Sequence, residues 1–218
     1  MYRERLRQLF RSAQFPVQTD AELSHFVPNS HAIGQLRELS YFEQWKLATA
    51  NKWYHVRMED HSLFIFNDAV GSPSYSFLHA PIRADTMREF LKGKKLDITA
   101  ANVRDNIEEY DLVLETAPLR SHVLPIRFDY DVSGYRPGVH PVAHLHIGLD
   151  NNLRIALSRR MSAQSFVLFV MRHLYPESWE RLLAQRASFN LAGLLRTSLP
   201  PIPPHHWSDI DCLELSLS

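Results

Sequence analysis

Cysteine and glycine are scarce in this chain of 218 residues, and each shortage excludes a class of site. Cys212 is the single cysteine, so no disulfide can form within the chain, and one copy cannot build a thiolate-rich zinc or iron–sulfur centre. The seven glycines form no phosphate-loop pattern, which argues against a nucleotide cradle made of backbone amides. The sequence also lacks the His-Glu pair of zincins and a nucleophile elbow.

A net charge and a long hydrophobic run are missing as well. The 24 basic residues are balanced by 24 acidic ones, so binding to nucleic acid would need a local positive patch. The most apolar run, "FVLFVM", is far shorter than the ~20 residues of a membrane span, and the charged first 15 residues do not resemble a signal peptide. We therefore expect a cytoplasmic protein with no membrane partner. Its balanced charge leaves oligomerisation open.

The order of periodic segments predicts an α+β fold. Residues are 45% hydrophobic and 11% aromatic, enough for a substantial core. Apolar residues recur at helical spacing near both ends of the chain and at every second position in the middle. This order favours a mainly antiparallel sheet of about six to seven strands over alternating βαβ units. The expected strands lie at 52–60, 62–68, 74–81, 109–118, 122–132, 143–149 and 153–158.

Helices are expected on both sides of these strands. We predict them at 1–15 and 38–52 before the sheet, at 84–95 within it, and from Ser162, Pro176 and 190–197 after it, with a loop at 26–34. Asp85 and Ser162 are candidate N-caps, and Gly93 is a candidate helix end. The predicted organisation is a single domain over 1–198, followed by a proline-rich spacer and tail over 199–218. The tail either presents an apolar segment to a partner or folds back on the domain.

The stretch "HPVAHLHIG", residues 140–148, contains the most distinctive polar residues. Alternation on a strand puts His144 and His146 on one face, and the same rule gives the preceding strand a polar face with Arg127, Asp129 and Asp131. The next segment adds Arg154. If these strands are neighbours, imidazole, carboxylate and guanidinium groups share one surface.

Three interpretations of this surface remain open. In the first, His144 and His146 act as acid and base in phosphodiester cleavage, most plausibly of RNA. Arg127 or Arg154 then stabilises charge on the phosphorane, and an aspartate such as Asp129 orients an imidazole. In the second, the two histidines bind a divalent metal, with Asp129, Asp131 or His140 completing the shell. In the third, the surface is a hydrogen-bonded scaffold or a partner-binding face, because a half-solvated sheet already explains the alternation.

Arg154 and two further arginines allow two interpretations. Arg154, Arg159 and Arg160 could form a ridge that contacts phosphates, or a solvated junction before the helix at Ser162. The sequence requires no cofactor, and a divalent metal is compatible with it.

Several blocks resemble, in order, those of an uncharacterised bacterial family, domain of unknown function 2290. They are "NKWYHVRMEDHSLFIF", "SYSFLHAP", "IRFDYD", "HPVAHLHIG" and "RRMSAQSFVLFVMRHLYPESW", and the resemblance covers roughly residues 40 to 180. It implies a bacterial accessory protein, often placed beside mobile or anti-phage genes, with a protein partner encoded nearby. It implies no established activity.

A looser similarity joins "RFDYD…HP…HLHIG" to small toxin proteins thought to act on RNA. Position by position, it points to Arg127, Asp129, His140, His144 and His146. The histidine-rich upstream tract of those toxins is reduced here to His55 and His61. Together these resemblances suggest a defence or toxin effector that acts on nucleic acid, RNA more than DNA. The alternative is a non-enzymatic subunit that binds a partner through the sheet face or the tail.

Overall fold

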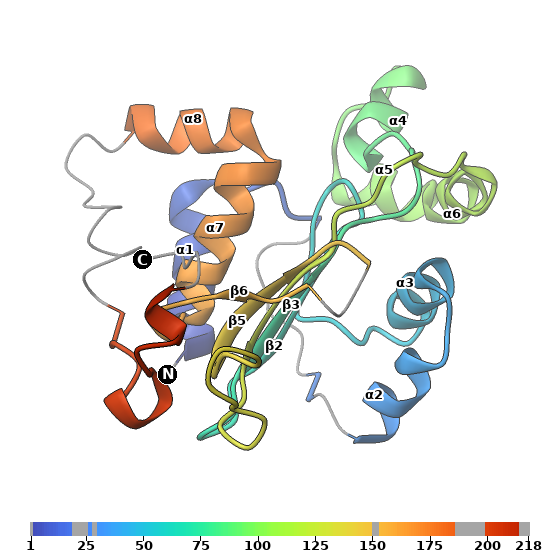
Figure 1. Ribbon diagram of the computed structural model, residues 1–218. Helices are drawn as coiled ribbons and strands as arrows, with labels where there is room; N and C mark the ends of the chain where they lie inside the picture. The colour runs from blue at the N-terminus through green and yellow to red at the C-terminus, as the bar shows by residue number, and fades with distance from the viewer. Residues whose placement is uncertain (1, 19–25, 28–29, 150–152, 186–198, 214–218) are drawn as a thin grey trace.

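The computed structural model describes residues 2–18, 26–27, 30–149, 153–185 and 199–213. Its centre is one six-stranded antiparallel sheet in the order β1-β2-β3-β4-β5-β6, which confirms the predicted α+β class (Figure 1). Each strand pairs with the one before it in the sequence, so the sheet is a simple meander. The strands are β1 (Val56–Arg57), β2 (Leu63–Asn67), β3 (Ser74–Leu78), β4 (Ile126–Tyr130), β5 (Ala143–Ile147) and β6 (Ile155–Ala156).

One face of the sheet forms the main core. Phe64, Phe128 and Leu145 point to this face and are fully buried, and they belong to the same cluster as Phe10 and Phe166 of the covering helices. Those helices are α1 (Tyr2–Ala13) and α7 (Ala163–Leu174), which lie side by side on the sheet (Figure 1). In β4 and β5, alternation therefore sends the aromatic and aliphatic side chains to this face and the polar ones to the other.

The C-terminal helices begin where the sequence predicts. The Ser162 side chain accepts a hydrogen bond from the backbone N–H of Ser165 and caps α7. Helix α8 (Pro176–Gln185) starts with a proline, which costs no hydrogen bond in a first turn. The helix predicted over 190–197 lies outside the described residues.

A second pair of helices covers one end of the opposite face of the sheet. They are α2 (Ser30–Arg37) and α3 (Tyr41–Ala50), and α3 packs Trp45 and Ala48 against Leu63 of β2 in a second, smaller core. Figure 1 shows α2 and α3 on the side of the sheet away from α1 and α7. The loop predicted over 26–34 is wrong in its second half, because α2 begins at Ser30.

The strand predicted over 109–118 is also wrong. This segment belongs to α6 (Ile107–Thr116), in which Tyr110 and Leu114 lie one turn apart toward the protein while Leu112 remains exposed. Helices α4 (Met87–Gly93) and α5 (Ala100–Asp105) precede it. Helix α4 ends at Gly93 as predicted, but its N-cap is Thr86 and not Asp85.

Residues 199–213 fold back on the domain. Ile202 is 6% exposed and belongs to the main core, and Arg159 forms an isolated antiparallel bridge with Pro201. Short 3-10 turns at Pro204–His206 and Asp211–Leu213 follow. The contacts of residues 199–213 match the prediction that the tail folds back on the domain, whereas residues 214–218 of the tail lie outside the described residues. In the described part of the chain, no helix combines the length and apolar character that crossing a membrane requires.

Candidate functional site

The β4–β5 register brings the predicted polar residues together. Arg127 pairs with His146 and Asp129 pairs with His144, so all four side chains leave the sheet on the face opposite the main core. We call these four residues the histidine face. On the other side of β4, Ser76 pairs with Arg127 and Ser74 with Asp129. The expected convergence of imidazole, carboxylate and guanidinium groups is present.

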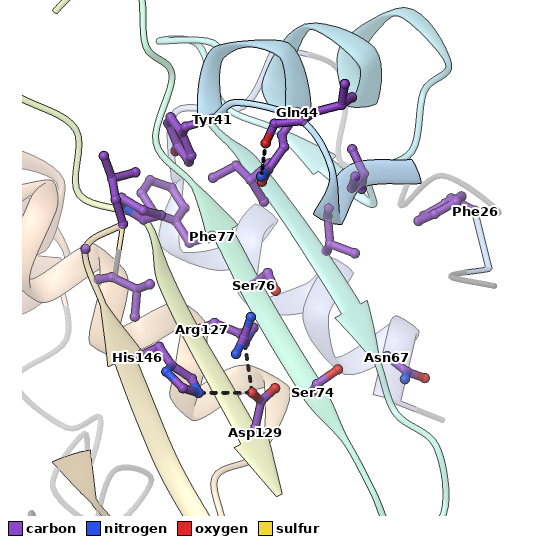
Figure 2. A pocket seen from close by; sticks show the side chains of 18 residues that line it. Phe26, Tyr41, Gln44, Asn67, Ser74, Ser76, Phe77, Arg127, Asp129 and His146 are labelled. Carbon is purple, nitrogen blue, oxygen red and sulfur yellow. Dashed lines mark hydrogen bonds and ion pairs between the residues drawn. The ribbon is translucent and has the colours of Figure 1, made fainter. Parts of the chain in front are cut away.

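Asp129 is the centre of the histidine face. Its Oδ2 lies 2.8 Å from Nε of Arg127 and 3.3 Å from Nε2 of His146, as Figure 2 shows by dashed lines. The same oxygen is 4.0 Å from Nε2 of His144. Nδ1 of His144 lies 2.7 Å from the carbonyl oxygen of Pro141. Because a carbonyl only accepts, this nitrogen carries the proton and Nε2 carries the lone pair that faces Asp129.

The two histidines are more enclosed than a half-solvated sheet would make them. His144 is 1% exposed and His146 is 4% exposed, whereas the Arg127 side chain is 39% exposed and that of Asp129 is 24% exposed. Nδ1 of His146 has no hydrogen-bond partner among the described residues. Solvent and ligands therefore reach the imidazoles past the arginine and the aspartate.

Burial and the neighbouring charges set the protonation of this face. Burial is the main cause that lowers the pKa of His144 to about 4, so its imidazole is neutral at neutral pH. Burial would raise the pKa of Asp129, but the hydrogen bond from His146 and the charge of Arg127 outweigh it and lower that pKa. The face therefore holds an ionised carboxylate beside an imidazole that does not take up a proton at neutral pH.

Two cavities meet at the histidine face. The first, which we call the polar groove, has a volume of about 340 Å³ and is lined by His140, His144 and Arg154 among others. The second, the mixed pocket, has a volume of about 580 Å³ and lies between the sheet and helices α2 and α3 (Figure 2). Both cavities have Arg127, Asp129 and His146 in their walls. One small group of polar and charged residues thus lies between a polar cavity and a partly apolar one.

The other predicted site residues have different surroundings. The ring of His140 packs edge-on against His144 at 4.9 Å between centroids. Asp131 accepts hydrogen bonds from the Ser133 hydroxyl and the Gly134 N–H, which fixes the turn after β4. Both residues line the polar groove beside Arg154.

Arg159 and Arg160 do not line the polar groove. Arg159 donates a hydrogen bond to the carbonyl oxygen of Leu199, and the Arg160 guanidinium lies over the ring of Tyr130 at 5.0 Å. Of the three arginines in the predicted phosphate ridge, the structure therefore brings only Arg154 to the cavity.

The sequence reasoning did not single out the serines and the α3 residues around the mixed pocket. Ser74 and Ser76 occupy the polar positions of "SYSFL", so alternation along this strand could have identified them. Tyr41 and Gln44 come from α3. The packing of this helix over β2 and β3 cannot be predicted from a local sequence pattern.

Three residues of the histidine face form a group that could hold a metal ion. One ligand atom each from Asp129, His144 and His146 lies within 4.8 Å of the other two. The predicted set of His140, His144, His146 and Asp131 shares two histidines with this group. Of the three residues that could complete the shell, Asp129, Asp131 and His140, the group contains Asp129, which is the acidic residue paired with His144.

The chain is thus an α+β protein with a meander sheet, in which two buried histidines and a partly buried aspartate lie beside an arginine. It belongs to a family described as "Uncharacterized conserved protein (DUF2290)", whose model matches residues 9–198. The match confirms the resemblance noted over roughly 40 to 180 and extends it at both ends. No curated protein and no solved structure matched the chain. The similarity to RNA-targeting toxins remains a prediction.

Proposed function

We propose that this protein cleaves phosphodiester bonds in nucleic acid, RNA in preference to DNA, at the histidine face. The observation that supports the proposal is the meeting of Arg127, Asp129 and the two histidines at the common wall of two cavities. On this proposal the protein is an effector of a bacterial defence or toxin module, as its looser similarity to RNA-targeting toxins suggests.

Arg127 and Arg154 would bind the substrate phosphate. Arg127 exposes 39% of its side chain, and both arginines line the polar groove. An arginine beside a developing phosphorane stabilises its additional negative charge, and its fork of donors fits phosphate oxygens. Since the whole chain has no net positive charge, this local pair would supply the attraction for the backbone.

RNA is the favoured substrate because it carries its own nucleophile. The 2′-oxygen would attack the phosphorus while the bond from phosphorus to the 5′-oxygen breaks. The Asp129, His144 and His146 group would accept the 2′-hydroxyl proton, solvent would protonate the departing 5′-oxygen, and Arg127 would stabilise the charge on the phosphate. A DNA strand would need a separately bound water. The mixed pocket then lies where the base of an adjoining nucleotide would enter, between Ile65 and Ser76 of the sheet and Tyr41 of α3.

The test is cleavage of labelled single-stranded RNA and of the matching DNA by the purified full chain. The variants are His144→Ala/His146→Ala and, as a matched control, His205→Ala/His206→Ala, which removes a histidine pair outside both cavities. We expect cleavage of RNA by wild type and the control, and a loss of about 10²-fold or more in the first variant. Circular dichroism checks that every variant is folded.

Two results would count against the proposal. Equal cleavage by wild type and His144→Ala/His146→Ala would place the activity elsewhere or in a contaminant. No cleavage by wild type, together with stable co-purification of the product of a neighbouring gene, would favour the partner-binding subunit.

A further inference from the structure

We infer that Asp129, His144 and His146 bind one divalent first-row transition-metal ion, such as Zn²⁺, Mn²⁺ or Co²⁺. The inference rests on the proposed function for its purpose: with the ion bound, the three side chains would be its ligands, and the ion would activate the 2′-hydroxyl in their place. Binding of the ion can be measured without any nucleic acid. Two imidazoles and one carboxylate are a donor set that suits these metals better than Ca²⁺ or Mg²⁺, and three protein ligands leave positions open for a substrate.

The separations of the three ligand atoms suit a shared ion. Bonds of roughly 2.0–2.2 Å to nitrogen and oxygen allow two ligand atoms to be at most about 4.2 Å apart. Asp129 Oδ2 is 3.3 Å from Nε2 of His146 and 4.0 Å from Nε2 of His144, and all three ligand atoms lie within 4.8 Å of one another. Binding of the ion would displace the proton that His146 shares with Asp129. Small side-chain rotations would bring the ligand atoms within the allowed separation, since His144 and His146 project from the same strand.

The hydrogen bond from His144 to Pro141 is the second, independent observation. It fixes the proton on Nδ1, so the lone pair of Nε2 faces a carboxylate oxygen at 4.0 Å, too far for a hydrogen bond. Two electron-rich atoms held opposite each other in a buried site repel unless a positive charge lies between them. Metal-binding histidines are commonly held by such a bond from the other ring nitrogen to a backbone carbonyl.

Arg127 sets the charge balance of the centre. Its Nε lies 2.8 Å from the same carboxylate oxygen, so the ion would lie next to a fixed positive charge. The single negative charge of Asp129 cannot neutralise both the divalent ion and the Arg127 guanidinium. The metal centre therefore attracts an additional anion. A substrate phosphate that enters the polar groove would supply it, bound by the ion and by Arg127 together.

The experiment is titration of the chelator-treated full chain with Zn²⁺ by calorimetry and with Co²⁺ by visible absorption. We expect one ion per chain and a Co²⁺ spectrum with nitrogen and oxygen ligands. His144→Ala and Asp129→Asn are each expected to weaken binding by about 100-fold, because removal of a ligand costs at least as much as removal of its supporting bond. Because asparagine has nearly the same shape as aspartate, Asp129→Asn can be used to test the site if His144→Ala does not fold.

His205→Ala/His206→Ala is the control for adventitious binding, because these adjacent histidines lie only 4.1 Å apart between ring centroids, and His205 is exposed. Unchanged binding in this variant supports the site. Equal affinity in wild type and Asp129→Asn, or loss of binding only in the control variant, would overturn it. Metal binding without RNA cleavage would overturn the proposed function alone, whereas cleavage that persists in EDTA without any bound metal would overturn only the metal centre.

Discussion

Asp129 Oδ2 lies 3.3 Å from Nε2 of His146, and the side chains come from adjacent strands that are paired in fixed register. The same oxygen is 2.8 Å from Nε of Arg127. The carboxylate therefore links a buried imidazole to a half-exposed cation. Replacing either neighbour changes the charge that the other experiences, so the contributions of Arg127 and of the histidines are coupled, and each variant needs separate measurements of cleavage and of metal binding.

Arg127→Gln should reduce RNA cleavage without removing the metal ligands. Loss of a preorganised donor to a developing anion typically costs about 10²–10³ in rate. Because the competing cation beside Asp129 is also removed, affinity for Co²⁺ should remain equal or increase. Rates on a labelled oligonucleotide and a Co²⁺ titration measure the two effects. Parallel loss of cleavage and of Co²⁺ binding would mean that Arg127 mainly holds the site together.

Ile65→Trp should close the mixed pocket. Ile65 pairs with Ser76 and lines this cavity, and the indole would fill the space that a base would occupy. We expect a higher KM for RNA with little change in Co²⁺ affinity, since Ile65 does not line the polar groove. Ile65→Val is the matched control and should behave as wild type. An unchanged KM in the tryptophan variant would show that substrate does not enter this pocket.

The residues of the site could be predicted from the sequence because alternation along a strand is a local property. "IRFDYD" and "AHLHI" each divide into an apolar and a polar face, and hairpin-like order along the chain makes such strands neighbours. The polar positions Arg127, Asp129, His144 and His146 follow from these two facts alone.

Burial and long-range packing could not be predicted in this way. Tertiary contacts enclose His144 and His146, and helices far away in sequence form the mixed pocket. The strand prediction at 109–118 failed for a related reason. "DLVLE" contains a short apolar run, which a strand and a helix share, but the buried Tyr110 and the half-buried Leu114 lie at helical spacing, and their partners come from other elements.

His61 should make the fold sensitive to acid. This fully buried side chain contacts Gln18 and Arg57 through Nδ1 and the Tyr110 hydroxyl through Nε2. Burial, assisted by the charge of Arg57, lowers its pKa from 6.5 to about 3. The unfolded chain thus takes up a proton below pH 6.5 that the folded chain rejects down to about pH 3. The free energy of unfolding should fall across this range, by roughly 3–5 kcal/mol in total from this group.

The comparison that isolates this effect is His61→Asn. Asparagine tolerates the left-handed backbone at this position, where φ is +70°, and it does not titrate. At pH 7 the variant should be less stable by about 1–3 kcal/mol, because buried polar partners lose their hydrogen bonds. Urea unfolding at pH 7 and pH 4.5 measures both. A loss of stability on acidification as large in His61→Asn as in wild type would assign the acid sensitivity to other groups.

Asp211 should anchor residues 199–213 to the domain. Its carboxylate is 1% exposed and accepts hydrogen bonds from the Tyr135 hydroxyl, the Gly138 N–H, and the N–H and hydroxyl of Ser208. Burial would raise the pKa of this group, but the hydrogen bonds outweigh it and lower the pKa from 3.8 to about 2. The corresponding stabilisation, about 2 kcal/mol, is present above pH 4 and is lost as the pH falls toward 2.

Asp211→Asn tests this anchor at neutral pH. The amide presents an NH₂ group to a site built from donors, so at least one buried donor loses its acceptor and the attachment should weaken by about 1–3 kcal/mol. We expect faster proteolytic cleavage within 199–213 and a lower melting temperature. Asp209→Asn, at an exposed position two residues away, should change neither. If both variants resist protease as wild type does, the tail is held by the burial of Ile202 and the bridge between Arg159 and Pro201, and not by the carboxylate.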